Sequence, residues 1–464
     1  MRYLSTKTRA NAVPIVALGK DALPSWVKRQ PKPLANWIRR TRFTAEPGTI
    51  SLVADSAGAL ARVLFGTGPS GAPAGEDMWE WASLAARLPE GLYRIEESSD
   101  PARAERVALG WVLGTYAFSR YRDDRARFAR LVWPEGADRA HVERTARAIF
   151  LARDLINTPA SDMGPRELAQ AARALARKNG ARCRVIKGDE LIGENYPAIH
   201  AVGRASAQAP RLIDIRWGGR RGRPKLALVG KGVCFDSGGL DLKPAAGMAL
   251  MKKDMSGAAH ALALAGMVME AKLPVSLRVL VPAVENSVSG DAFRPGDVVA
   301  TRKGTTVEIG NTDAEGRVIL ADALFEAASE RPDLIIEFAT LTGSARVALG
   351  TELPALFCND DATTDALLAH AAAEGDPLWR MPLWEPYRDK VKGKIADLTN
   401  APEGGYGGAI TAALFLREFV DPRVPWAHID FMAWNLASKP GRPEGAEAMG
   451  LRAVYALIKD RFGK

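Results

Sequence analysis

The chain has 464 residues, of which 47% are hydrophobic and 25% are charged, and its formal net charge is +9. This length exceeds what one hydrophobic core usually serves, so we expect a soluble globular protein of two domains. Three widely spaced cysteines exclude a disulfide framework, and no apolar stretch approaches the roughly 18 residues of a membrane span, so we expect a cytoplasmic protein.

Residues 1–135 predict a small N-terminal α/β domain. Short apolar runs alternate with a Gly/Pro-rich turn near residues 66–75, and two helical patterns follow at 77–88 and 102–116. The apolar runs lie at 12–18, 49–54 and 59–65. No motif in this domain carries obvious chemistry.

Residues 136–160 predict a helix that connects the two domains. Apolar residues recur at helical spacing from 138 to 156, and the residue before Pro159 disfavours a helix. The connecting helix should therefore end at Asn157-Thr158.

Residues 161–464 predict a larger α/β catalytic domain with a mixed sheet that is flanked by helices. Helical patterns occupy residues 167–178, 256–271, 318–329, 410–419 and 446–462. Strand patterns occupy residues 182–186, 225–229, 276–284, 306–309, 334–340 and 426–431. Such alternation predicts helices on both faces of a sheet, with reactive side chains in the loops beyond the carboxyl ends of the strands.

The segment Asn311–Arg317 is the densest group of chemically active side chains. Asp313 and Glu315 lie one residue apart, and Arg317 follows two residues later. Carboxylates suit divalent cations, and arginine can hold a small anion. In isolation, Asp313 and Glu315 could instead form a structural salt bridge with Arg317, which is the less favoured alternative.

Glycine-bounded loops upstream supply further candidates. Lys231 and Asp236 lie in the glycine-rich run 230–239, Lys243 follows it, and Asp254 precedes a helical pattern. The glycines permit the bends that would bring these side chains together. The run is not a P-loop, because it lacks GxxxxGK[ST]. Each lysine could be a surface residue and Asp254 a helix cap, but the full set predicts a two-metal hydrolase centre.

Other hydrolase chemistries fit poorly. None of the five histidines forms HExxH, and no G-x-S-x-G elbow occurs, so a histidine-ligated zinc protease and a serine hydrolase are disfavoured. We interpret His260, His428 and Cys234 as structural residues.

Four segments closely resemble, in order and spacing, the active-site segments of the leucyl aminopeptidases, the M17 or cytosol aminopeptidase family. They are Asn311–Arg317 and residues 229–243, 251–257 and 339–343. The resemblance covers about residues 150–435 and is weak over the first 130. It implies a metal-dependent exopeptidase that removes the N-terminal residue of peptides through a hydroxide bridging two metal ions.

The resemblance also implies two divalent ions, Zn²⁺ or Mn²⁺. The tighter ion would be held by Lys231, Asp236, Asp254 and Glu315. The more exchangeable ion would be held by Asp236, Asp313 and Glu315.

The remaining site residues are assigned by the same resemblance. Lys243 would stabilise the oxyanion, and Arg317 would hold a bicarbonate ion that shuttles a proton. Thr340 and Leu341 would bond the peptide backbone, and Met251 would line the pocket for the first side chain.

Relatives of this family form homohexamers, which is the assembly that we expect. The segment 445–450 departs from the family's Gly-Ala-Thr-Gly pattern, and we expect it to reshape the substrate pocket. An alternative function is a DNA-binding architectural protein on the same fold, since the arginine-rich segments 120–130 and 216–225 could attract nucleic acid or other anions. We expect no membrane partner.

Overall fold

The computed structural model describes residues 2–6, 11–68, 77–96, 100–122, 127–219 and 222–463. The chain divides into two compact units, one of residues 1–147 with 437–444 and one of residues 148–436 with 445–464. Both units combine helices with a sheet, which confirms the predicted fold class. Residues 437–444 group with the first unit although they follow most of the second unit in the sequence.

The first unit contains a six-stranded sheet in the order β1-β6-β5-β2-β4-β3. Its strands are β1 (Leu4–Ser5), β2 (Val13–Gly19), β3 (Ile50–Ala54), β4 (Leu60–Gly68), β5 (Leu92–Ile95) and β6 (Arg130–Val132). Its helices are α1 (Leu23–Lys28), α2 (Lys32–Thr41), α3 (Asp77–Ala82), α4 (Leu84–Arg87) and α5 (Pro101–Leu113). The three predicted apolar runs are strands, whereas the helix predicted at 77–88 is interrupted at Ser83. Most of the turn predicted near 66–75 lies outside the described residues.

The connecting helix α6 (Arg139–Asn157) forms where the sequence predicts it. It ends just before Thr158-Pro159, because the ring of a proline disfavours helical backbone in the residue before it. A short 3-10 helix (Ala160–Asp162) follows.

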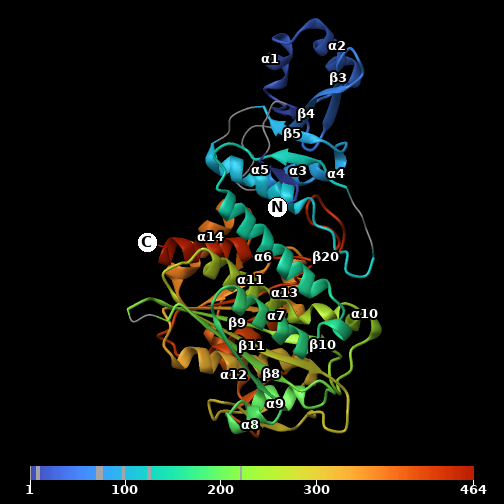
Figure 1. The fold of residues 1–464 in the computed structure, drawn as a ribbon. Coiled ribbons are helices and arrows are strands. Elements are labelled where there is room, and N and C mark those ends of the chain that lie inside the picture. Colours follow the sequence, from blue (N-terminus) through green and yellow to red (C-terminus); the bar gives the residue numbers. More distant parts are fainter. Residues whose placement is uncertain are drawn as a thin grey trace. The chain divides into compact units, whose positions relative to one another are not determined.

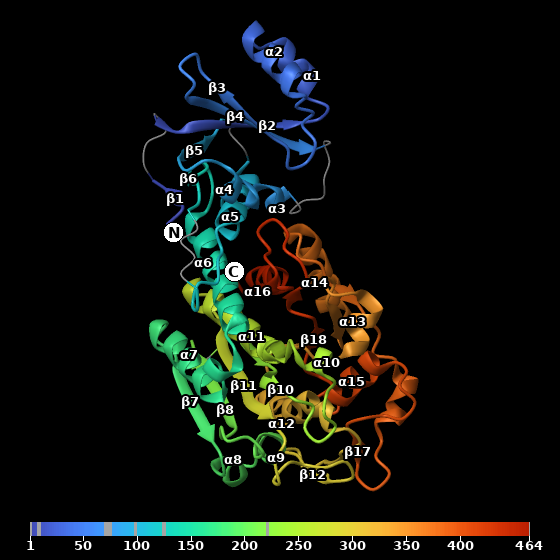
Figure 2. The ribbon, with the colours of Figure 1, turned by 90° about the vertical axis from the view of Figure 1, so that its right-hand side faces the viewer.

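The second unit is built on a nine-stranded mixed sheet (Figures 1 and 2). The strand order is β16-β15-β18-β14-β9-β11-β8-β7, and β10 also pairs with β11. The strands are β7 (Arg182–Lys187), β8 (Arg211–Trp217), β9 (Lys225–Gly230), β10 (Gly232–Asp236), β11 (Ser276–Asn286), β14 (Leu334–Ala339), β15 (Ala355–Cys358), β16 (Trp379–Arg380) and β18 (Trp426–Asp430). The strands β10, β11, β9, β14 and β18 run parallel, so their carboxyl ends lie on one edge.

Helices flank this sheet, with α11 on one side and α12 on the other (Figure 1). The longer helices are α7 (Pro165–Lys178), α11 (Ser256–Glu270), α12 (Glu315–Ser329), α14 (Asp361–Glu374), α15 (Gly408–Arg417) and α16 (Leu451–Phe462). The shorter ones are α8 (Glu190–Gly193), α9 (Pro197–Gly203), α10 (Ala245–Met248) and α13 (Gly343–Leu349). Small additional sheets contain β12 (Val298–Ala300), β13 (Thr306–Glu308) and β17 (Leu398–Thr399), and β19 (Trp434–Asn435) with β20 (Gly445–Ala446).

The start of α11 packs directly on the sheet because of two glycines. A Cβ atom on Gly257 would lie 2.1 Å from Phe338 O in β14, and one on Gly230 would lie 2.4 Å from Gly257 O. Such distances are impossible for a real side chain, so only glycine permits this approach. Beyond these glycines α11 is buried along almost its whole length, as expected for a helix that is apolar on all sides.

Three sequence predictions in this unit were wrong in detail. The helix predicted at 446–462 begins only at Leu451, because residues 445–446 form β20. The helix predicted from 318 begins at Glu315, and the glycine-rich run contains strand β10 rather than only a turn. Strand β8 was not predicted, since arginine and aspartate interrupt its apolar pattern. Among the described residues, no helix combines the length and apolar character needed to cross a bilayer.

Candidate functional site

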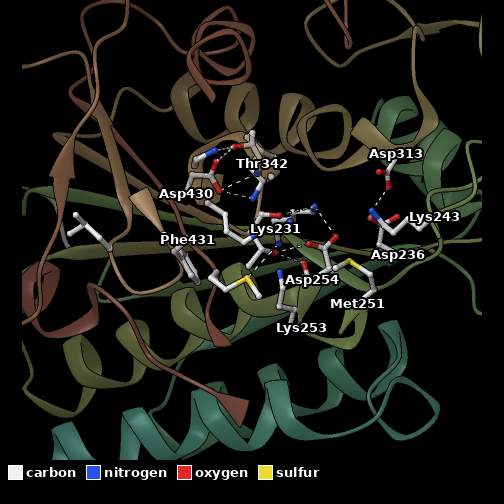
Figure 3. A pocket seen from close by; sticks show the side chains of 18 residues that line it. Lys231, Asp236, Lys243, Met251, Lys253, Asp254, Asp313, Thr342, Asp430 and Phe431 are labelled. Carbon is white, nitrogen blue, oxygen red and sulfur yellow. Dashed lines mark hydrogen bonds and ion pairs between the residues drawn. The ribbon is translucent and has the colours of Figure 1, made fainter. Parts of the chain in front are cut away.

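A cavity of about 190 Å³ opens where the carboxyl ends of the parallel strands meet (Figure 3). Lys231 follows β9, Asp236 ends β10, Thr340 follows β14 and Asp430 ends β18. The structure thus brings side chains from four strands to one edge, as the topology of parallel sheets requires. Two 3-10 helices complete the site, Met251–Met255 before α11 and Thr312–Ala314 before α12.

Lys231 is held by two carboxylates in the protein interior. Its side chain is 4% exposed, and Nζ lies 2.7 Å from Asp254 Oδ2 and 2.9 Å from Glu315 Oε1. Nζ also donates to Thr340 O at 3.3 Å. Burial opposes the ammonium charge, but the neighbouring carboxylates outweigh it and raise the pKa of Lys231. A Cβ on Gly316 would lie 2.4 Å from Lys231 Cε, so the glycine after Glu315 is needed to make room.

Lys243 forms a second ion-pair cluster at the cavity wall (Figure 3). Its Nζ lies 2.8 Å from Asp236 Oδ2 and also contacts Asp313 Oδ1. Burial again disfavours the charge, and the pairing with Asp236 and Asp313 nevertheless raises the pKa of Lys243. The two lysines therefore neutralise two groups of acidic side chains that lie side by side.

Three carboxylates, those of Asp236, Asp313 and Glu315, have oxygens within 4.8 Å of one another. Burial, and next the charge of Asp236, raise the pKa of Glu315 to about 8 and that of Asp313 to about 6. Acids crowded in this way favour either a proton or a cation between them. The oxygen donors also match the ligand preference of divalent metals, so the residues fit such an ion.

Asp254 and Asp236 are oriented by further hydrogen bonds. Asp254 Oδ1 accepts from Thr340 Oγ1 at 2.7 Å. Asp236 Oδ1 accepts from Gly238 N and from Asn286 Nδ2, both at 2.9 Å. Oriented carboxylates of this kind are typical of metal ligands, whose partners hold the ligating atoms in place.

Arg317 lies on the first turn of α12 and is buried, but it does not line the described cavity. One of its terminal nitrogens donates to Asn400 O at 2.7 Å, whereas Nε is buried and has no partner among the described residues. Burial lowers the pKa of Arg317 to about 10. A buried guanidinium with an unused donor can still bind a small anion.

The structure places the predicted substrate residues on the cavity wall. Met251, Thr340 and Leu341 all line it. The Leu341 N–H is already donated to Asp430 Oδ1 at 2.8 Å, which leaves only its carbonyl for a ligand.

Sequence reasoning missed several site residues. Asn286 and Asp430 end strands β11 and β18, so the strand-end rule applied to Asp236 would have found them. Asn400 binds the backbone of Gly310, Asn311 and Ala314, but it follows a two-residue strand that leaves no pattern. Lys253 and Arg346 line the cavity, although no sequence signal distinguished them from surface cations.

Residues 445–450, which depart from the family's sequence pattern, contact other residues of the second unit. Glu447 forms a buried ion pair with Arg153, with 2.9 Å between Oε1 and a guanidinium nitrogen, and accepts from Asn435. The segment is not among the described residues that line the cavity, so the structure does not support its expected role in shaping the pocket.

The residues interpreted as structural have partners or are buried. His260 Nδ1 donates to Ser256 O at 2.7 Å, and its Nε2 accepts from Met449 N at 3.0 Å. His428 pairs with Glu337 inside the sheet, and Cys234 is fully buried. All three cysteines are free.

Two family profiles match the chain. Residues 150–455 match the profile described as "Cytosol aminopeptidase family, catalytic domain". Residues 13–134 match the one described as "M17 aminopeptidase, N-terminal domain".

Individual relatives agree with this match. The probable cytosol aminopeptidase of Geobacter sp. (strain M21) is 42% identical over 82% of this chain and 78% of the relative. That of Roseiflexus castenholzii is 39% identical, with 86% of each protein covered. The crystal structure of cytosol aminopeptidase from Coxiella burnetii is 49% identical, covers all of both chains and superimposes with a TM-score of 0.95. The bottromycin maturation enzyme BotP in complex with Mn is 34% identical, covers 97% of this chain and 100% of its own, and gives a TM-score of 0.87.

Proposed function

The chain belongs to the cytosol aminopeptidase family, whose members are hydrolases, and we propose that its cavity removes the first residue from peptides with a free N-terminus. One observation carries the proposal: six charged side chains from separate segments converge at the carboxyl edge of the sheet. They are Lys231, Asp236, Lys243, Asp254, Asp313 and Glu315.

Two divalent cations, Zn²⁺ or Mn²⁺, would be held by Lys231, Asp236, Asp254, Asp313 and Glu315. The close grouping of three of these carboxylates supports this assignment. When bound, such ions lower the pKa of a shared water and polarise the peptide carbonyl. Lys231 would have to release its proton to act as a ligand, since an ammonium has no lone pair. Asp254 and Glu315, which form ion pairs with Lys231 in this structure, would then bind the same metal ion as Lys231.

Lys243 would donate a hydrogen bond to the oxygen of the scissile carbonyl as negative charge develops there. Its ammonium already lies on the cavity wall and is partly exposed, so it can reach a ligand by giving up its contact with Asp313. A charge-assisted bond of this kind favours the transition state over the bound substrate.

Arg317 would hold a bicarbonate ion, which supplies a base for the attacking water. The unused Nε of Arg317 supports this role, because it offers a donor to an anion. Thr340 and Leu341 would align the peptide backbone through their carbonyls, and Met251 would contact the first side chain.

Further proposals follow from the family. We expect action in the cytoplasm, assembly as a homohexamer, and the domain division 1–135, 136–160 and 161–464. Sedimentation of the purified protein tests the hexamer, and a smaller stable species would contradict it.

The function is tested with metal-free protein that is reloaded separately with Zn²⁺, Mn²⁺, Co²⁺ or Mg²⁺. Each sample is given peptides that differ only in a free or an acetylated N-terminus. We expect release of the first residue from the free peptide alone, in at least one metal form. Cleavage of the acetylated peptide, or no cleavage with any metal, would overturn the proposal.

A further inference from the structure

Two cations on the cavity wall, Lys253 and Arg346, form no ion pair with an acid among the described residues. Lys253 has 4% exposure and lines the cavity beside Met251 and Asp254 (Figure 3), yet its Nζ makes no ion pair or hydrogen bond with any described residue. Arg346 lines the same cavity from α13, and within the described part of the chain its guanidinium forms one hydrogen bond, to Met432 Sδ at 3.5 Å. A thioether is a weak acceptor and supplies no countercharge.

The acids on this side of the cavity are already engaged. Asp430 accepts from Leu341 N at 2.8 Å, from Thr342 N at 3.2 Å and from Thr342 Oγ1 at 2.6 Å. Asp254 accepts a hydrogen bond from Thr340 and forms an ion pair with Lys231. Both carboxylates are thus oriented toward other donors, and neither forms an ion pair with Lys253 or Arg346.

Apolar side chains are interspersed with these charged and polar groups on the cavity wall. They include Met251, Ala345, Leu353, Phe431 and Met432. Burying an unpaired ammonium in such surroundings is unfavourable, and a carboxylate from a ligand would offset that cost. A side chain with methylene groups and a carboxylate end can contact both these apolar side chains and the two cations.

We propose that the cavity selects peptides whose first residue is glutamate or aspartate, with the side-chain carboxylate bound by Lys253 and Arg346. The inference rests on the proposed function, in which Met251 lines the pocket for the first side chain. It adds a substrate class, N-terminal acidic residues, and two specificity-determining residues.

A very short peptide has a second carboxylate, at its C-terminus, that Lys253 and Arg346 could bind. The first side chain is favoured because Lys253 is two residues from Met251 on the same 3-10 helix. A comparison of dipeptides with free and amidated C-termini separates the two sources.

The test compares kcat/KM for C-terminally amidated peptides that are identical except for Glu, Gln or Leu as the first residue. Wild-type protein should favour Glu over Gln by roughly tenfold or more, the size of one charge-assisted hydrogen bond. Arg346→Gln and Lys253→Met should each bring the Glu/Gln ratio close to one. Arg177→Gln, which removes an exposed arginine on α7, should leave the ratio unchanged.

The ratio is informative because it cancels any general loss of activity in a variant, and Arg346 is exposed enough that its replacement should not disturb folding. Equal rates for Glu and Gln in the wild type, or a ratio that neither variant alters, would overturn the inference. So would a preference that depends only on the free C-terminus.

A binding experiment distinguishes failure of this inference from failure of the proposed function. Calorimetry on metal-loaded protein should show L-glutamate binding at least tenfold more tightly than L-glutamine, and Arg346→Gln should remove the difference. If no peptide is cleaved, the proposed function fails, and the calorimetric comparison still decides whether the carboxylate pocket exists.

Discussion

Asn286 donates from Nδ2 to Asp236 Oδ1 across 2.9 Å and so joins the end of β11 to the end of β10. The same amide nitrogen donates to Thr312 O at 3.0 Å, next to Asp313. One buried amide thus sets the spacing between two segments that carry proposed metal ligands.

Asn286→Ala should lower metal affinity by roughly 10- to 100-fold, because Asp236 loses the partner that orients it. It should also lower the free energy of unfolding by about 1–3 kcal/mol, since Thr312 O loses its bond. Metal titration and denaturant unfolding measure the two effects. Asn179→Ala, which removes an amide at the end of α7, is the control and should leave metal affinity unaltered.

Glu315→Ala should abolish both activity and metal binding while the fold persists. Glu315 is shared between the proposed metal sites and is fully buried beside Lys231. Metal content by elemental analysis, together with circular dichroism, checks this outcome. A folded Glu315→Ala protein that retains metals and activity would contradict the ligand assignment. Glu190→Gln, an exposed change on α8, should retain both.

Lys243→Ala should lower kcat by roughly 100-fold or more while metal content stays at the wild-type level, because Lys243 is proposed to act on the oxyanion rather than on the ions. Single-turnover assays on metal-replete protein measure it. A parallel loss of metal would show that Lys243 instead maintains Asp236 and Asp313 in position.

Asp322 predicts a pH dependence of stability outside the proposed metal site. Burial raises the pKa of this carboxyl group to about 7, despite bonds from Arg302 N, Ile199 N and Ala198 N. The folded state therefore binds this proton more tightly than the unfolded state does.

Asp322 should thus stabilise the fold most at low pH, and its contribution should fall as pH rises from about 4 to 7. The slope should approach ~1.4 kcal/mol per pH unit. Asp322→Asn should remove this component from urea unfolding measured across that range. An identical pH profile in the variant would show that Asp322 is not protonated in the folded protein.

Gly257→Ala should be strongly destabilising, because the added Cβ would lie 2.1 Å from Phe338 O. Gly266→Ala on the same helix is the matched control, since its Cβ would meet only the tip of Leu175 at 3.3 Å. Gly266→Ala gains about 1 kcal/mol of helix propensity, whereas Gly257 lies in the first turn of α11, where the gain is smaller. A loss of stability in Gly257→Ala well beyond this difference therefore reports the close approach to β14. Unfolding of the metal-free proteins measures it, and equal stabilities would contradict the packing argument.

The sequence predicted the fold class, the connecting helix and the central strands, because each carries a regular apolar pattern. It also grouped the residues around Lys231 and Glu315, since motif and spacing are local properties. It could not reveal the convergence of Lys253 and Arg346 on one wall. Lys253 lies on the 3-10 helix before α11, and Arg346 lies on α13, about 90 residues further along the chain. Only the tertiary structure brings these two segments to the same cavity. Strand β8 could not be predicted, because charged residues interrupt its apolar pattern. Their partners come from elsewhere in the fold, as Arg278 does for Asp214.

The buried pair of Arg153 and Glu447 joins residues that are 294 positions apart in the sequence. During synthesis α6 is made long before Glu447, so this ion pair forms only after the intervening residues have been added. A polypeptide that stops before Glu447 would lack this ion pair, so we expect the second unit of such a product to be less stable than that of the longer chain.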